Sequence, residues 1–296
     1  MLTLHVTHET RYDYAARVSL SQHLAHLRPR EMPGQRVDAA QIEIEPAPSH
    51  WTKGTDVFGN ARDAFALYAP HQALRVVATS RVTLDAPART TARSDAQSEP
   101  WERVADACRY RAGRPYVPAS EFVFGSPFVP PLAALHEYGA PSMTADRPLL
   151  AAARDLMQRI HADFIYDGDA TEVHTPLADV LDARRGVCQD FAHLMIGMLR
   201  AFGLPARYVS GYLLTLPPPG QDRLLGADAS HAWVSAWCPP LGWVDFDPTN
   251  ALLPGEGNTH VTLAVGRDYG DVIPLRGVIR GGGEHTLSVA VSVLQA

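Results

Sequence analysis

One segment near the middle of the chain constrains the fold more than any other. Residues 188–202, CQDFAHLMIGMLRAF, have the length of a helix and are apolar nearly all round. A helix without a polar face must be enclosed by other elements. Gly203 followed by Pro205 gives this helix a clear end. The runs after it are strand-like, which predicts the α+β class; they are ARYVSGYLLTL, SHAWVSAWC, GWVDFD, HVTLAV and HTLSVAVSVL.

The N-terminal part of the chain has the pattern of strands. Up to about residue 85, alternating or apolar runs are separated by turns rich in Pro, Gly and Asp. This pattern predicts an antiparallel β-sandwich. Gly59 and Asn60, in DVFGNARD, stand between two such runs, and both residue types tolerate the positive φ of a hairpin turn.

Composition divides the chain into three parts. The β-sandwich domain is expected to span residues 1–86. The next stretch is richer in Pro, Ser, Thr and Ala, which predicts a linker with short helices over residues 87–141. Helical periodicity begins near Arg147 and continues through PLLAAARDLMQRIHADF, so the second, α+β domain is assigned to residues 142–296.

Charge and cysteine content exclude several classes of protein. The net charge is -6 and Lys and Arg are scattered, so no nucleic-acid partner is expected. The first dozen residues carry charge and no apolar run approaches the length of a membrane span, so we expect a cytoplasmic protein with no membrane partner. Cys108, Cys188 and Cys238 show no CxxC spacing, which argues against a disulfide framework and a zinc-finger site.

Cys188 is the first candidate for chemistry. It follows a glycine turn in ARRGVCQDFAH and falls in the first turn of the expected helix. Free backbone N–H groups and the positive end of the helix dipole favour an anion there, as can nearby Arg184 and Arg185. The N–H of Cys188 itself could also bind an oxyanion. The alternative is that Cys188 is one more small apolar side chain of a buried helix.

A histidine and two carboxylates lie downstream on neighbouring strand-like runs. His231, in SHAWVSAWC, is followed after a Pro-Pro-Leu-Gly turn by GWVDFDPTN, which places Asp245 and Asp247 on one face. A hairpin would bring His231 beside one of these carboxylates. A carboxylate bound to one imidazole nitrogen leaves the other to take a thiol proton. The order of Cys, His and Asp is that expected for papain-like nucleophilic catalysis.

Several of these motifs are specific when taken together. They are GVCQDFAHLMIGMLRAFGLPARYVSGYL, SHAWVSAWCPPLGWVDFDPTN and AVGRDYGDV in the second half, and HETRYDY, LRPR and DVFGN in the first. Together they resemble the bacterial transglutaminase-like superfamily of cysteine proteases, with its N-terminal bacterial transglutaminase-like β domain. The resemblance covers almost the whole chain, the linker excepted. It implies a transglutaminase-like catalytic core and a triad of Cys188, His231 and Asp247.

The resemblance also implies a chemistry. We expect cysteine-dependent acyl transfer on a peptide or protein substrate through a thioester, without a cofactor. Water as acceptor would make a protease or amidase and an amine would make a transamidase, and the sequence does not choose between them. The tryptophan that helps hold the oxyanion in animal transglutaminases has no counterpart between Trp101 and Cys188. The Cys188 N–H is expected in this role, with Tyr166 or Gln189 as side-chain donors.

Other interpretations remain at this stage. A metal site would recruit Cys188, His193, His231 and an aspartate, but Cys188 and His193 are five residues apart and would not share a helix face, so no metal is expected. Asp190 and His193 point away from Cys188 at helical spacing, which favours capping and core hydrogen bonds. A non-catalytic peptide-binding or scaffolding protein could also retain the fold.

Overall fold

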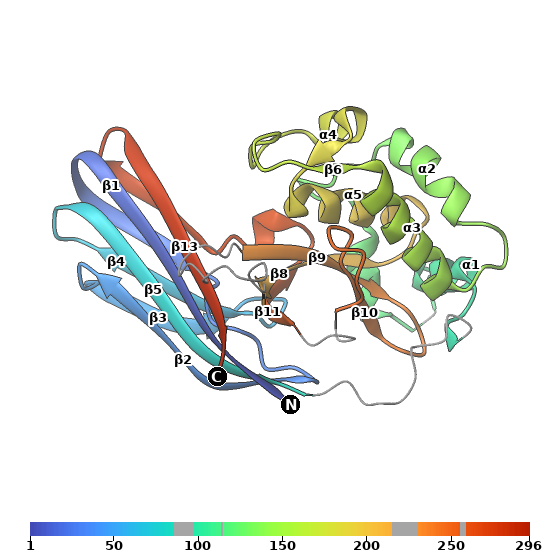
Figure 1. Ribbon diagram of the computed structural model, residues 1–296, viewed down its shortest axis with the longest axis horizontal. Helices are drawn as coiled ribbons and strands as arrows, with labels where there is room; N and C mark the ends of the chain where they lie inside the picture. The colour runs from blue at the N-terminus through green and yellow to red at the C-terminus, as the bar shows by residue number, and fades with distance from the viewer. Residues whose placement is uncertain (86–96, 114, 215–229, 255–258) are drawn as a thin grey trace, which may run out of the picture.

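The computed structural model describes residues 1–85, 97–113, 115–214, 230–254 and 259–296. It has the predicted α+β class, with an antiparallel β-domain beside a core of helices on a sheet (Figure 1). Its strands are β1 (Leu2–Ala25), β2 (Gln35–Glu45), β3 (His50–Thr55), β4 (Ala61–Leu67), β5 (His71–Leu84), β6 (Ile165–Tyr166), β7 (Arg185–Gly186), β8 (Ala206–Leu213), β9 (Ser230–Trp237), β10 (Trp243–Phe246), β11 (His260–Gly266), β12 (Leu275–Gly281) and β13 (His285–Gln295). Its α-helices are α1 (Trp101–Cys108), α2 (Ala133–Gly139), α3 (Leu149–Asp163), α4 (Leu177–Ala183) and α5 (Cys188–Ala201).

β1 joins the two halves of the N-terminal β-domain. Its first part pairs with β5 on one side and β13 on the other. After an irregularity between Asp13 and Val18, its second part pairs with β4 and β12. β2 extends the first half and β3 the second. Apolar residues of both halves meet in one cluster, as expected of a sandwich; they include Ile44, Phe65, Leu67 and Val76.

The last two strands of the chain return to this domain. β12 and β13 both pair with β1, and Val293 of β13 lies opposite Val6. Figure 1 shows β13 beside β1. The predicted boundary of the second domain, 142–296, is therefore wrong at its C-terminal end. Alternation of polar and apolar residues identified the strand near the C-terminus but carries no information about its partner.

The core is built around the helix predicted over residues 188–202. α5 packs against β8 and β9, and α2, α3 and α4 cover its other sides. The enclosed side chains include Phe191, Leu194, Met195 and Leu199, all at most 1% exposed. The sheet beneath has the order β10-β9-β8-β11 and is antiparallel throughout. The start of α5 is thus held close to β9, the strand that carries His231.

Part of the expected linker belongs to the core. α1 and α2 fall within residues 87–141, and their Val104 and Leu135 are buried in the same apolar cluster as α5. Trp101 packs edge to face against Phe202. The short helices were expected, but they are structural parts of the core. Each contributes few apolar residues, so the polar composition concealed that they belong to the core. Residues 87–96 and 114 of this segment lie outside the described residues.

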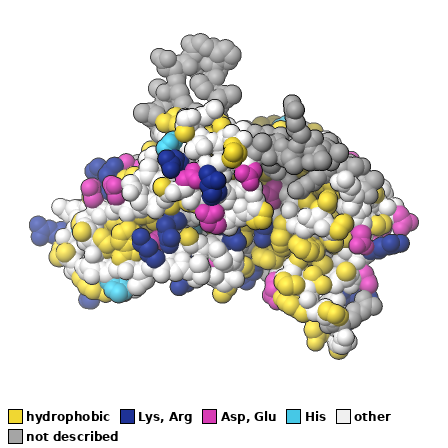
Figure 2. Space-filling view, turned by 90° about the horizontal axis from the view of Figure 1, so that it is seen from below, with side chains coloured by type: hydrophobic (Ala, Val, Ile, Leu, Met, Phe, Trp, Pro, Cys, Tyr) yellow, Lys and Arg dark blue, Asp and Glu magenta, His cyan; other side chains and the backbone are white. Residues whose placement is uncertain are grey.

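The surface of the β-domain carries ion pairs and one predicted turn. Arg11 pairs with Asp13 and Arg75 with Glu9, both at 2.8 Å. On the face drawn in Figure 2, basic and acidic side chains also lie side by side. Gly59, with φ 76°, turns the chain between β3 and β4 as predicted. None of the described helices has the length and apolarity needed to cross a membrane.

Candidate active site

Cys188 is the first residue of α5. The residue before it, Val187, donates its backbone N–H to the carboxylate of Asp190 at 2.9 Å. The same carboxylate oxygen accepts the hydroxyl of Thr171 at 2.6 Å. Asp190 therefore fixes the entry into the helix, which is the capping role expected of it. Cys188 itself is only partly buried, at a helix end whose backbone N–H groups favour an anion.

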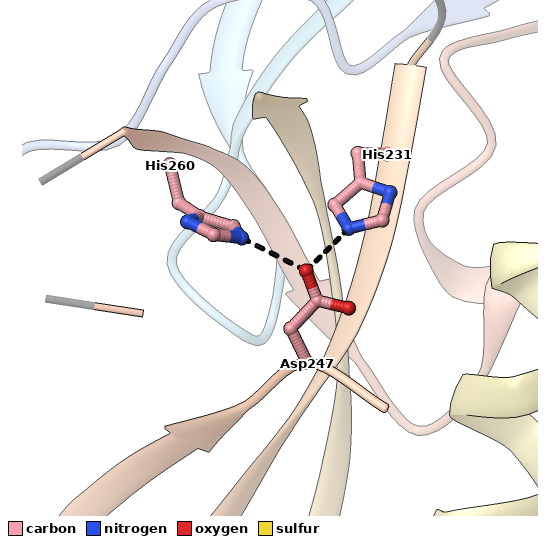
Figure 3. A group of neighbouring side chains, drawn as sticks. All are labelled: His231, Asp247 and His260. Atoms are coloured by element: carbon pink, nitrogen blue, oxygen red, sulfur yellow. Dashed lines mark hydrogen bonds and ion pairs between the residues drawn. The ribbon is translucent and has the colours of Figure 1, made fainter. Parts of the chain in front are cut away.

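His231 links this helix end to the sheet. It lies on β9 opposite Gly211 of β8, and its side chain is 10% exposed. Its Nε2 is 2.7 Å from Oδ2 of Asp247 (Figure 3). A carboxylate only accepts, so Nε2 carries the proton of this bond and Nδ1 is left for another partner. Cys188 is among the groups that raise the pKa of His231, so its thiol lies close to this imidazole.

The two aspartates of the hairpin have different partners. Asp245, on β10, accepts the indole N–H of Trp233 at 3.1 Å. Asp247 follows β10 and is fully buried. Its Oδ1 accepts the backbone N–H groups of Thr249 and Asn250 at 3.0 and 3.2 Å. The turn after β10 therefore wraps around this carboxylate and aims Oδ2 at the imidazole of His231.

Burial and hydrogen bonding act in opposite directions on this pair. Burial lowers the pKa of His231, but its hydrogen bonds with Asp247 and Cys188 outweigh burial and raise that pKa to about 10. Burial raises the pKa of Asp247, yet the hydrogen bonds from His231 and His260 outweigh it and hold that pKa well below its ordinary value. Both shifts describe an imidazolium bound to a carboxylate. His231 therefore holds its proton at neutral pH.

A second histidine, His260, contacts the same carboxylate. It is the first residue of β11, and its Nε2 lies 3.0 Å from Oδ2 of Asp247 (Figure 3). The side-chain amide of Asn250 donates to this oxygen at 2.8 Å. Sequence reasoning missed His260. The available signal was a histidine opening the apolar run HVTLAV, but spacing alone did not place β11 at the edge of β8.

These side chains also offer a set of metal donors. One nitrogen each of His231 and His260 and one oxygen of Asp247 lie within 4.8 Å of one another. Zinc accepts such a set. However, both nitrogens lie at hydrogen-bond distance from one oxygen, and a nitrogen that donates its proton cannot bind a metal at the same time. This donor set differs from the set with Cys188 and His193 that was weighed from the sequence.

The two predicted side-chain oxyanion donors, Tyr166 and Gln189, lie near the start of α5 but differ in their contacts. Tyr166, on β6, lies opposite Gly186 of β7, two residues before Cys188, and its side chain is exposed. Gln189 follows Cys188, and its amide donates to the carbonyl of Val173 at 3.2 Å. The Gln189 amide is thus engaged with the backbone, whereas the Tyr166 side chain is exposed beside the helix start.

The arginines before Cys188 are held by other groups. Arg184 lies over the rings of Tyr138 and Phe164, at 4.6 and 4.8 Å. Arg185 pairs with Asp167 at 3.2 Å. Their expected support of a thiolate is therefore better assigned to the N-terminus of α5.

His193 has a structural place in the core. It is 3% exposed, and its Nε2 accepts the backbone N–H of Tyr269 at 3.1 Å. Its ring contacts those of Phe128 and Tyr208. These contacts are the core hydrogen bonding and packing expected from its helical spacing.

A cysteine at the start of a buried helix, beside a His–Asp pair on an antiparallel sheet, defines a transglutaminase-like fold. Comparison with known proteins agrees. Residues 4–83 match the bacterial transglutaminase-like N-terminal region, and residues 138–248 match the transglutaminase-like superfamily. The chain therefore belongs to the transglutaminase-like superfamily.

Individual relatives add detail. An uncharacterized protein of Mycobacterium tuberculosis is 41% identical over 296 residues, which cover 98% of this chain and 91% of that protein. A protein-glutamine gamma-glutamyltransferase of Pseudomonas aeruginosa is 42% identical over 76 residues, 25% of this chain and 11% of that enzyme. A solved structure from Cytophaga hutchinsonii, described as a "putative cysteine protease", has a TM-score of 0.74 at 18% identity and covers 99% of this chain and 90% of that one. The last likeness concerns the fold.

Proposed function

We propose that this protein is a cysteine-dependent acyl-transfer enzyme that acts on amide groups of peptides or proteins. Cys188 is the nucleophile, His231 the general acid and base, and Asp247 the carboxylate that orients the imidazole. The observation that carries the proposal is the 2.7 Å bond between His231 Nε2 and Asp247 Oδ2. This bond leaves Nδ1 of His231 to exchange a proton with Cys188.

The proposed first half of the reaction makes a thioester. In the reactive form of the pair, the thiol proton of Cys188 has moved to Nδ1 of His231. The sulfur attacks the carbonyl carbon of the amide, and the carbonyl oxygen becomes an oxyanion that the N–H groups at the start of α5 can bind. Nδ1 then gives its proton to the amide nitrogen, the C–N bond breaks and the amine leaves.

The second half releases the acyl group. Neutral His231 takes a proton from water or from an amine, which attacks the thioester carbonyl. The C–S bond breaks, the sulfur leaves as a thiolate and His231 is again protonated. Asp247 stabilises the imidazolium at both stages and stays ionised, a role that its low pKa supports.

The kind of amide follows less directly from the site. The relative from Pseudomonas aeruginosa is named for transfer of a glutamine γ-glutamyl group. Its similarity to a quarter of this chain supports a glutamine side chain as the acyl donor to test first. Water and amines compete for a thioester in the same site, so both products must be looked for.

The test is mass spectrometry of products. Wild type would be incubated with glutamine-containing peptides and an excess of a primary amine, beside Cys188→Ala and Cys108→Ala. Cys108 is a buried cysteine on α1 and serves as the matched control. We expect product from wild type and Cys108→Ala, and a loss of at least about 1,000-fold in Cys188→Ala. An amine adduct would identify a transamidase, and a cleaved or deamidated peptide a hydrolase.

One result would favour a non-catalytic protein. If no peptide reacts, and Cys188 is alkylated no faster than Cys108 and Cys238 at neutral pH, the acyl-transfer proposal fails and a peptide-binding or scaffolding role replaces it.

A further inference from the structure

His260 makes a contact that the proposed triad does not need for its proton transfers. Its side chain is 4% exposed, and Nε2 lies 3.0 Å from the Asp247 oxygen that binds His231. The acceptor is a carboxylate, so Nε2 carries the hydrogen. Nδ1 lies 3.3 Å from the hydroxyl of Thr259, which can donate to it. His260 thus directs its Nε2–H at Asp247. The hydroxyl of Thr259 can stabilise the tautomer that carries the hydrogen on Nε2.

This N–H matters because Asp247 has no exposure to solvent. Its Oδ2 receives His231, His260 and the amide of Asn250, and its Oδ1 receives two backbone N–H groups. These bonds replace the water that an ionised carboxylate would otherwise have. Loss of the His260 bond would leave the anion less well solvated and its Oδ2 less firmly oriented toward His231. The imidazolium of His231 would then lose part of its counter-charge.

The position of His260 depends on β11, which is the edge strand of the core sheet. One side of β11 pairs with β8. On its other side, Gln35 of the N-terminal β-domain accepts the Thr262 N–H at 2.7 Å and donates to the Thr262 carbonyl at 2.8 Å. Asn60 does the same at Val265, with 2.9 Å and 2.7 Å. Two amide side chains thus take the place of a neighbouring strand.

We propose that His260 is a positioning residue for Asp247 and that the N-terminal β-domain acts on the site by holding β11 through Gln35. This inference rests on the proposed function, since it assigns His260 a task within that triad. Thr262 stands two residues after His260, so the Gln35 clamp fixes the strand next to the imidazole. The β-domain thereby supports the site, although Gln35 and Asn60, which bind β11, are not members of the triad.

The first experiment follows the alkylation of Cys188 by iodoacetamide from pH 5 to 10, with peptide mapping to separate it from the other cysteines. His260→Leu removes the N–H, and His260→Gln keeps an N–H donor of similar reach. We expect His260→Leu to slow alkylation at pH 6 by about ten-fold or more and to change it little at pH 9. His260→Gln should stay within about three-fold of wild type. A wild-type profile in folded His260→Leu would overturn the role of His260.

The second experiment tests the clamp. Gln35→Met removes the amide at similar length, and His71→Leu removes a buried imidazole of the β-domain that contacts Ala69 and Ser21 instead of β11. We expect Gln35→Met to slow alkylation at pH 6 by about three-fold or more. His71→Leu should keep the wild-type profile even if its thermal midpoint falls. A Gln35→Met protein that loses only thermal stability would overturn the role assigned to the β-domain.

Two further variants distinguish failure of this inference from failure of the proposed function. His231→Ala and Asp247→Asn would be measured in the same series. If both abolish the fast alkylation at pH 6 while His260→Leu does not, only the present inference is wrong. If neither changes it, the acyl-transfer proposal itself loses its support.

Discussion

Gly186 lies so close to Asp190 that no side chain fits between them. A Cβ built on Gly186 would be 2.6 Å from Oδ2 of Asp190, the oxygen that caps the N–H of Val187. The glycine two residues before Cys188 thus has a steric reason. It lets the chain pass the capping carboxylate and enter α5 with Cys188 at the first position.

Gly186→Ala is therefore expected to damage the helix start. The added methyl should displace Asp190 and lower the free energy of unfolding by about 1–3 kcal/mol. Alkylation of Cys188 at neutral pH should slow as well, because the helix end that favours the thiolate is disturbed. Thermal unfolding and peptide-mapped alkylation check both effects. Gly168→Ala is the control, since a Cβ there meets no atom within 4 Å. Equal behaviour of the two variants would contradict the close contact.

The His231–Asp247 pair should make stability depend on pH. His231 has its pKa raised to about 10, so its stabilisation is complete below its ordinary pKa of about 6.5 and is lost between there and 10. The pKa of Asp247 is depressed, so its stabilisation is present above about 4 and is lost in more acidic solution. The thermal midpoint of wild type minus that of His231→Gln/Asp247→Asn should be largest from about pH 4 to 6.5. A difference that grows from pH 6.5 to 10 would contradict the assigned imidazolium.

Asn60 should matter for stability more than its turn position suggests. It is fully buried and its amide occupies both backbone groups of Val265. Asn60→Ala leaves buried polar groups of β11 without these partners, which should cost about 2–4 kcal/mol. Urea unfolding would measure the loss, with the exposed Gln41→Ala on β2 as the control. A loss no larger than that of the control would mean that the bonds of Asn60 to Val265 contribute little to stability.

Chelation is expected to leave the proposed acyl-transfer activity unaffected. The two imidazoles donate their Nε2 protons to Asp247, and the proposed reaction uses only thiol, imidazole and carboxylate groups. Dialysis against EDTA should thus leave turnover within error of the untreated enzyme, and elemental analysis should find no stoichiometric zinc in active protein. Activity that disappears on dialysis and returns with zinc would show that this donor set holds a metal.

Local patterns in the sequence predicted much of the site. The all-round apolar character of residues 188–202 gave α5 and placed Cys188 at its first turn. The alternation on either side of the Pro-Pro-Leu-Gly turn gave β9 and β10. It left two carboxylates, Asp245 and Asp247, and only the family resemblance singled out Asp247. The structure distinguishes the two carboxylates, because Asp245 accepts the indole N–H of Trp233.

Contacts between distant segments could not be predicted in this way. His260 reaches Asp247 because β11 pairs with β8, and no local pattern encodes that pairing. The return of β12 and β13 to β1 was missed for the same reason. The helices α1 and α2 were partly concealed, since each is short and buries few residues, such as Val104 and Leu135.

The pairing of β12 and β13 with β1 has a consequence for synthesis. Among the described strands β1 is made first, and two of its partners are made after the transglutaminase-like core. A domain of this kind cannot finish folding while the chain is still growing, and contacts across such long sequence separations form slowly. β4 and β5 can cover one edge of β1 early, but the edge that pairs with β12 and β13 stays open until those strands are made. The nascent protein therefore passes through a stage in which this edge is exposed to aggregation and to chaperones.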